Sequence, residues 1–172
     1  MPVNAAQRAL AGASTLLALL LLAPPVAAVD VGDAAPGFSL PSTDGRPIVL
    51  EKLRGQVVYV DFWASWCGPC RRSFPWMNEL QQRYGERGFA IVAINVDKLR
   101  ADAERFLQAN AARFTVVYDP EGATPLAYAV AGMPSSYLID RRGSVVEIEA
   151  GFRDERKSAR EATIQSLLAA PH

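Results

Sequence analysis

The chain has 172 residues, half of them hydrophobic, and its 18 lysines and arginines balance 18 aspartates and glutamates. This length fits a single domain, and a net charge of zero argues against a polybasic surface for nucleic acid or for an anionic membrane. Cys67 and Cys70 are the only cysteines, so the chain lacks the disulfide framework that stabilises many small secreted domains.

Residues 1–28 are predicted to form a secretory signal peptide. Arg8 precedes an apolar run over residues 10–23, and small residues lead to an expected cleavage after Ala28. The apolar run is short for a membrane span, which needs about 20 residues, and an uncleaved anchor is the alternative. The exported domain is then expected to comprise residues 29–172.

The first part of this domain predicts a hairpin followed by a central strand. Residues 31–50 are rich in Pro, Gly, Ser and Asp, with short apolar pieces at 38–40 and 48–50 around the turn residues 43–45. Residues 57–63 carry apolar side chains on both faces, as expected of a strand that is covered on both sides.

This strand runs into Trp66-Cys67-Gly68-Pro69-Cys70, which is expected to open a helix. Gly68 allows a tight turn, and Pro69 suits the first helical turn, where its missing N–H costs little. Cys67 then lies beside unpaired helical N–H groups at the positive end of the helix dipole, which favours a thiolate. We expect Cys67 to be exposed and Cys70, one turn later, to face inward.

Two thiols at this spacing allow several interpretations. A structural disulfide, half of a zinc site and a pair of inert thiols are the alternatives to a redox-active couple. Zinc is disfavoured because no second cysteine pair exists and His172 is the only histidine. A Cys-x-x-Cys motif next to a βαβ pattern favours redox chemistry.

The helix that follows the cysteines has apolar residues at helical spacing, with Pro75 inside it. The remaining elements are expected, in chain order, as a strand at 89–96, a helix around 103–107, a strand at 114–118, a short helix at 124–130, two strands at 137–140 and 145–149, and a last helix at 154–168. This order predicts an α/β domain whose sheet is parallel in its first half and ends in an antiparallel hairpin.

Several segments together resemble the exported, thioredoxin-like TlpA/ResA family. The segments that carry the resemblance are residues 60–72, 94–97, 114–120 and 132–140. The resemblance extends from residue 31 to the C-terminus. It implies a thioredoxin fold with an N-terminal β-hairpin and a central helix–strand insertion over residues 97–130.

The resemblance also implies roles for the residues around the thiols. Cys67 is the attacking nucleophile, and Cys70 then attacks the mixed disulfide and releases the reduced partner. Asp61 occupies the position of the buried acid of thioredoxins. A carboxylate within an apolar strand is costly to ionise, so we expect a raised pKa for Asp61 and a role as proton acceptor for Cys70. A purely structural Asp61 is the alternative.

A second segment is expected to face the disulfide. Met133-Pro134 matches the position of the family's cis proline, with an ordinary turn proline as the alternative. The backbone of Met133 is expected to pair with an extended client segment, and Trp66 to offer an apolar contact surface. Ser73 departs from the family pattern, since many relatives carry Glu there, so acid-assisted tuning of the site is not expected from this position.

The sequence therefore predicts an exported thiol–disulfide oxidoreductase, without cofactor or bound metal, that reduces protein disulfides in the bacterial periplasm. The resemblance suggests apocytochrome c or the copper-site cysteines of an oxidase as clients, and a membrane thiol transporter as electron donor. A monomer is expected. The alternatives are a Cu(I)-binding thioredoxin-like chaperone, a disulfide oxidase or isomerase, a peroxidase, and an inert scaffold.

Overall fold

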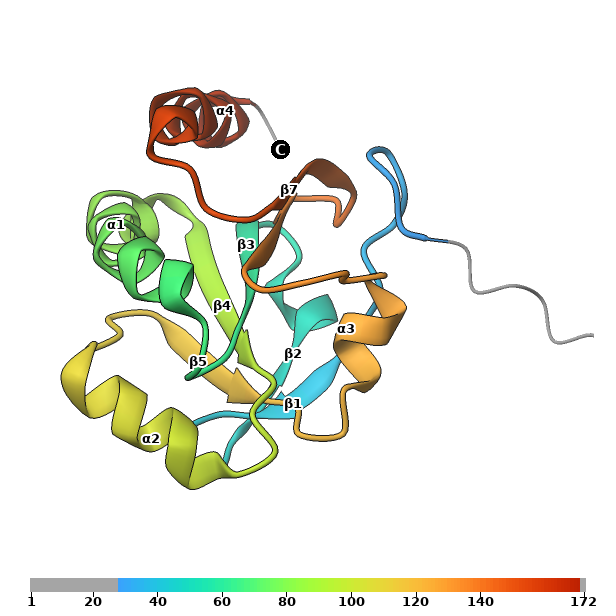
Figure 1. Ribbon diagram of the computed structural model, residues 1–172. Helices are drawn as coiled ribbons and strands as arrows, with labels where there is room; N and C mark the ends of the chain where they lie inside the picture. The colour runs from blue at the N-terminus through green and yellow to red at the C-terminus, as the bar shows by residue number, and fades with distance from the viewer. Residues whose placement is uncertain (1–27, 171–172) are drawn as a thin grey trace, which may run out of the picture.

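A five-stranded mixed sheet with helices on its faces forms the centre of the computed structural model, which describes residues 28–170 (Figure 1). The predicted signal peptide lies, apart from Ala28, outside the described residues and stays a prediction. Within residues 28–170, no helix combines the length and the hydrophobicity that a membrane crossing needs.

The sheet has the strand order β5-β4-β3-β6-β7. Its strands are β3 (Val57–Trp63), β4 (Phe89–Asn95), β5 (Thr115–Tyr118), β6 (Ser135–Ile139) and β7 (Val145–Ala150). The first three run parallel to one another, and β6 and β7 are antiparallel to their neighbours. The predicted change from parallel to antiparallel pairing is confirmed.

A separate hairpin precedes the sheet and consists of β1 (Ser39–Pro41) and β2 (Pro47–Val49). An isolated bridge between Ser42 and Val117 ties the hairpin to β5. The predicted N-terminal hairpin is thus confirmed. The predicted insertion is also present, because α2 (Arg100–Ala109), β5 and α3 (Ala123–Ala127) lie between β4 and β6.

The other helices frame the sheet. They are α1 (Gly68–Tyr84), α4 (Lys157–Ala169) and the short 3-10 helices η1 (Leu50–Leu53), η2 (Gly85–Arg87) and η3 (Asp154–Arg156). The helix α1 continues through Pro75, since buried residues on both sides of this proline hold it against the sheet. The last helix was expected from residue 154, but its first turn is the separate 3-10 helix η3.

Two apolar clusters form the core, one on each face of the sheet. The side chains of β3 alternate between them because successive residues of a strand point to opposite faces. Tyr59 and Trp63 belong to the face covered by α1, α2 and α4. Val60 and Phe62 belong to the opposite face, which the N-terminal segment covers together with Tyr128 at the end of α3. Every residue of β3 is buried.

Candidate active site

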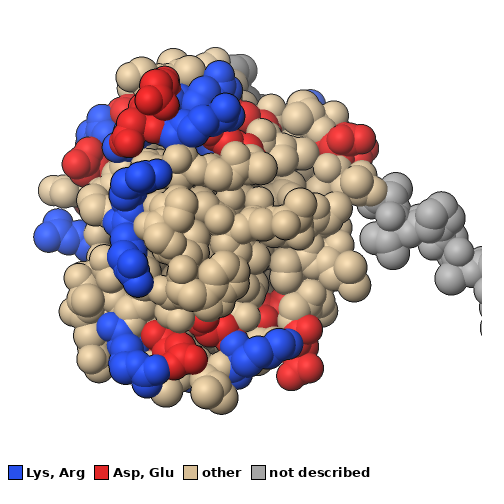
Figure 2. Space-filling model, viewed as in Figure 1, with Lys and Arg blue, Asp and Glu red and all other residues tan. Residues whose placement is uncertain are grey.

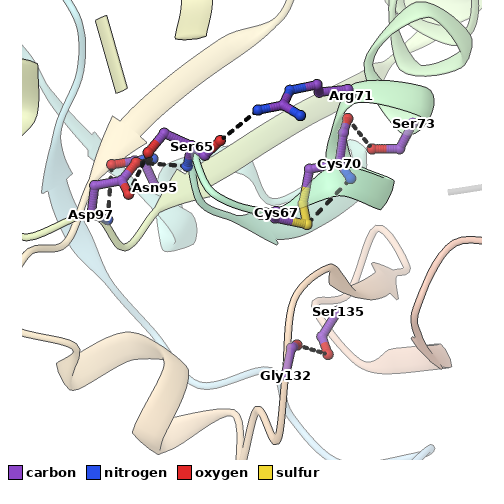
Figure 3. The surroundings of a disulfide bond; sticks show 9 residues. All are labelled: Ser65, Cys67, Cys70, Arg71, Ser73, Asn95, Asp97, Gly132 and Ser135. Atoms are coloured by element: carbon purple, nitrogen blue, oxygen red, sulfur yellow. Dashed lines mark hydrogen bonds between the residues drawn. A yellow bond between two sulfur atoms is a disulfide. The ribbon is translucent and has the colours of Figure 1, made fainter. Parts of the chain in front are cut away.

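Cys67 and Cys70 form a disulfide at the start of α1, directly after the carboxyl end of β3. Cys67 is the N-cap residue of α1 with an extended backbone, and its Sγ accepts a hydrogen bond of 3.2 Å from the backbone N–H of Cys70 (Figure 3). Pro69 occupies the first turn of the helix, as predicted. The helix start thus directs a backbone N–H at the sulfur of Cys67, which is the arrangement that stabilises a thiolate.

The accessibility of Cys67 differs from the sequence prediction. We expected Cys67 to be exposed, but it is only 3% exposed, and Cys70 is fully buried. In the disulfide form the Cys67 side chain turns toward Cys70 and joins the apolar cluster that partly buried Met133 borders. Its neighbours Gly68 and Pro69 are exposed. The exposed turn therefore lies directly beside a sulfur atom that is itself nearly buried.

Polar contacts fasten the loop before Cys67 to the end of β4. The Asp97 carboxylate accepts hydrogen bonds of 2.9 Å from the backbone N–H and from the hydroxyl of Ser65. The side-chain amide of Asn95 donates to the same carboxylate at 2.8 Å (Figure 3). All these groups lie at the carboxyl ends of parallel strands, which fixes the turn that presents the thiols.

Residues 132–135 lie opposite the disulfide, and Figure 3 shows the sulfur of Cys67 on the side toward this segment. The Met133–Pro134 peptide bond is cis, as the resemblance predicts. Ser135 begins β6 and pairs with Phe62 near the end of β3, which brings this segment alongside the thiols. The Pro134 carbonyl accepts a hydrogen bond from Gly151 N–H at 2.7 Å, and Pro134 itself is buried.

Asp61 lies in the middle of the sheet, on the same face as Tyr59 and Trp63, and is 2% exposed. Burial raises the pKa of its carboxyl group to about 8, although the positive charge of Arg160 acts in the opposite direction. Its Oδ2 atom has no hydrogen-bond partner. The raised pKa that the sequence predicts is confirmed, and a carboxyl group on the thiol face can exchange a proton near neutral pH.

A buried arginine beside Asp61 escaped the sequence analysis. Arg160, on α4, is 4% exposed and forms ion pairs with Glu147 and Glu149 on β7 at 3.1 and 2.8 Å. The sequence did contain an indication of it. Arg160 precedes buried Ile164 by four residues and Leu167 by seven, so it occupies the apolar side of the last helix.

The three tryptophans have different environments. Trp66 is 70% exposed beside Cys67, whereas Trp63 and Trp76 are buried. Trp63 packs against Phe74 and Phe106 at ring distances of 5.0 and 4.8 Å. Trp63 and Trp76 are therefore packing residues.

Two chain segments near the thiols carry no charge, although exposed Arg71 and Arg72 follow Cys70 directly. Residues 62–70 and 122–139 contain no charged side chain. Figure 2 shows an uncharged area at the centre of the face viewed in Figure 1, with lysines, arginines and acidic residues around its rim.

Ser73 is buried on α1, and its hydroxyl donates a hydrogen bond of 3.0 Å to the Cys70 carbonyl. The hydroxyl of Ser73 is thus bonded within its own helix. Across residues 28–170, no group of three or more His, Cys, Asp or Glu side chains is arranged to hold a metal ion.

These features, a Cys-x-x-Cys disulfide at a helix start with a cis proline opposite, define a thiol–disulfide oxidoreductase of the thioredoxin fold. The family model described as Redoxin matches residues 30–164. The chain belongs to this family.

Individual relatives agree with this assignment. The thiol-disulfide oxidoreductase ResA of Geobacillus thermodenitrificans is 39% identical over 124 residues, which cover 72% of this chain and 71% of the relative. ResA of Bacillus subtilis is 34% identical over 127 residues, with coverages of 74% and 71%. A crystal structure of a putative thiol:disulfide interchange protein DsbE from Chlorobium tepidum is 51% identical, with a TM-score of 0.80, and covers 83% of this chain and 100% of its own.

Proposed function

We propose that the protein is exported and reduces disulfides of other proteins through the Cys67/Cys70 couple. The observation that carries this proposal is the N-cap position of Cys67, whose Sγ accepts the N–H of Cys70 next to an exposed, uncharged turn. A thiolate at Cys67 is stabilised by this N–H and by the helix dipole. The thiolate is the species that attacks a disulfide.

The reaction begins with both cysteines reduced. The Cys67 thiolate attacks one sulfur of the client disulfide, forms a mixed disulfide and releases the other client sulfur as a thiolate. Asp61 accepts the proton of the Cys70 thiol, and the resulting thiolate attacks the sulfur of Cys67. The Cys67–Cys70 disulfide closes, the second client thiolate leaves, and the client has gained two electrons.

The segment opposite the thiols is proposed to hold the client. Ser135 pairs with β3, and Met133 lies just before it beside the thiols, so the backbone of Met133 is placed to bond an extended client strand. Exposed Trp66 offers an apolar contact next to Cys67. Backbone pairing with apolar contact requires no particular client sequence, which suits an enzyme that serves more than one disulfide.

The proposed exported location means that a reductase needs a partner that supplies electrons. Extracytoplasmic compartments are oxidising, so a reductase there needs a source of electrons. A membrane thiol transporter is the proposed donor, and the predicted signal peptide, with the uncleaved anchor as its alternative, places the domain where the two can meet. Apocytochrome c and the copper-site cysteines of an oxidase are the proposed clients, and the domain is proposed to act as a monomer.

The test is trapping of the mixed disulfide with a client of known disulfide content, such as insulin. We expect Cys70→Ser to accumulate a covalent complex through Cys67 that thiols release, and Cys67→Ser to form none. The wild-type protein should turn over when a reductant is supplied. Complexes that form equally through Cys70 would contradict the assigned roles, and absence of insulin reduction by the wild-type protein would contradict the function.

A further inference from the structure

Asp61 is the first of three polar residues that lie in one row across the sheet. It pairs with Ser136 on β6, and Ser136 pairs with Glu149 on β7. Neighbouring strands are about 4.8 Å apart, so the row leads from the thiol side of β3 to the last strand in two such steps. Glu149 is 6% exposed, so the row contains a second buried carboxyl group.

Arg160 lies over this row and contacts the residues that flank Asp61. Its Nη1 donates hydrogen bonds to the Ser136 hydroxyl at 2.6 Å and to the Tyr59 hydroxyl at 2.9 Å. Ser136 is the cross-strand partner of Asp61, and Tyr59 precedes Asp61 by two residues on the same face of β3. Tyr59 and Ser136, the two residues next to Asp61, therefore hold the Arg160 guanidinium group near the Asp61 carboxyl group.

The two carboxylates of β7 partly neutralise the positive charge of Arg160. Its Nε donates to Glu147 at 3.1 Å, and its Nη2 lies 2.8 Å from a Glu149 oxygen. The buried Arg160 thus interacts with three acidic side chains. Glu147 and Glu149 are in direct contact with it, and its charge acts on Asp61 at longer range. Interactions between charges in such a low-dielectric region are much stronger than at the surface.

We propose that Arg160 is a positioning residue that sets the ionisation of Asp61 during thiol exchange, and that Glu149 opposes its action. This inference rests on the proposed role of Asp61 as proton acceptor. A positive charge beside Asp61 favours its carboxylate, which is the form that accepts the Cys70 proton. A negative charge at Glu149 attracts the same guanidinium and favours the protonated acid. The C-terminal helix α4 thereby takes part in the chemistry of α1.

The surroundings of Asp61 contain few other groups that could produce this effect. On the adjacent strands, its partners Ala93 and Ser136 carry no charge. The titratable and charged side chains near Asp61 on this face are Tyr59 on β3, Cys67 and Cys70 at α1, Glu147 and Glu149 on β7, and Arg160 on α4. Two more exposed arginines pair with the β7 carboxylates: Arg153 lies 3.4 Å from Glu149, and Arg156 lies 3.8 Å from Glu147. Burial raises the pKa of Tyr59 to about 12, so this phenol stays neutral over the working range.

Two substitutions test the proposal through shifts of opposite sign. The readout is the pH dependence of kcat/KM for disulfide reduction, whose acid limb reports ionisation of Asp61. Arg160→Met removes the cation, and we expect the limb to move to higher pH by about one unit, with roughly tenfold lower activity below the limb. Glu149→Gln removes one of the negative charges that neutralise Arg160. The positive charge then acts more strongly on Asp61, and we expect the limb to move to lower pH.

Four controls separate this electrostatic role from a structural one. Arg160→Lys keeps the charge and should retain a limb near that of the wild-type protein. Arg87→Met removes an exposed arginine of η2 and should leave the profile unchanged. With Asp61→Asn as background, neither Arg160→Met nor Glu149→Gln should move the profile. If Arg160→Met does not fold, Glu149→Gln, measured alone and in the Asp61→Asn background, decides the question.

Shifts of the same sign for Arg160→Met and Glu149→Gln would overturn the proposal, as would an unmoved limb in folded, active variants. Shifts that persist in the Asp61→Asn background would also overturn it, since they would place the effect on a thiol. The proposed function has its own, separate test. It fails if the wild-type protein reduces no disulfide at any pH.

Discussion

The two faces of the central sheet use the same strands for different purposes. On the face away from the thiols, β3 contributes Val58, Val60 and Phe62 to an apolar cluster. The tyrosine hydroxyls on this face donate hydrogen bonds to backbone carbonyls. The Tyr137 hydroxyl, for example, donates to the Tyr128 carbonyl at 2.6 Å. The thiol face also has an apolar cluster, but it buries Asp61 and a charged cluster around Arg160.

This difference shows where the fold gains stability and where it places chemistry. A buried carboxyl group without a full set of partners costs free energy that an apolar side chain of similar size does not. Among residues 28–170, Asp61 is the buried carboxyl group with an oxygen that lacks a hydrogen-bond partner, and it lies on the thiol face. Substitutions on the two faces should therefore affect different measurements.

The largest contrast is expected for Cys67→Ser. It removes the attacking thiolate, so disulfide reduction should fall to the background rate. The matched variant Cys70→Ser should still attack the client and stop at the mixed disulfide. The rate of insulin reduction and the yield of trapped complex are the measurements. Residual turnover by Cys67→Ser above the background would contradict the assigned nucleophile.

On the opposite face, Phe62→Ala should act on stability. Phe62 is fully buried against Tyr128 and Tyr137, at ring distances of 5.3 and 5.8 Å. The loss of its ring leaves a cavity and should lower the free energy of unfolding by about 3–5 kcal/mol. Denaturant unfolding measures this change. At a temperature at which the variant is folded, its kcat/KM should stay near that of the wild-type protein, and a large loss would break the division between the faces.

Asp61→Asn should change both activity and the pH dependence of stability. Loss of a proton acceptor should reduce disulfide reduction by about 10²-fold or more. Because the pKa of Asp61 is raised to about 8, the folded state holds a proton between pH 4 and 8 that the unfolded state has released. The wild-type protein therefore loses stability as pH rises through this window, on the order of a few kcal/mol in all.

The asparagine variant carries no proton to lose at this position. As pH rises from 5 to 8, the wild-type protein should therefore lose unfolding free energy relative to Asp61→Asn. Denaturant unfolding at several pH values gives this difference. A difference that is constant over the range would show that Asp61 titrates normally in the folded protein.

The smallest effect is expected for Trp66→Ala. Trp66 is 70% exposed, so its loss should change the free energy of unfolding by about 0.5 kcal/mol or less. If Trp66 contacts clients, KM for a protein disulfide should rise several-fold while the rate with a small disulfide stays the same. An unchanged KM would remove Trp66 from the proposed client surface.

The fold was largely predictable because its signals are local. Apolar runs located each strand of the sheet to within about two residues, and Cys67-Gly68-Pro69-Cys70 marked the start of α1. The start of α4 was less accurate, since an acidic first turn at residue 154 also fits the 3-10 helix that precedes it. The arrangement of the hairpin against β5 depends on a long-range bridge that no local pattern contains.

The position of the disulfide and the raised pKa of Asp61 were predictable from the sequence, but the residues around them were not. Arg160 lies about 100 positions after Asp61, and only the register of β3, β6 and β7 brings its partners together. The low exposure of Cys67 follows from the closed disulfide and from packing near Met133, which belongs to a distant segment. Sequence patterns report which residue types are present, whereas their environment is set by tertiary contacts.

The measurement that tests the central claim most directly is a redox titration of the Cys67/Cys70 couple against defined thiol buffers, with tryptophan fluorescence and thiol trapping as readouts. We expect one reversible two-electron transition at a reducing potential, near the value of about −270 mV that is typical of thioredoxin. A potential near about −120 mV, as in strong disulfide donors, would contradict the proposed direction of the reaction. Absence of a reversible transition would contradict the function itself.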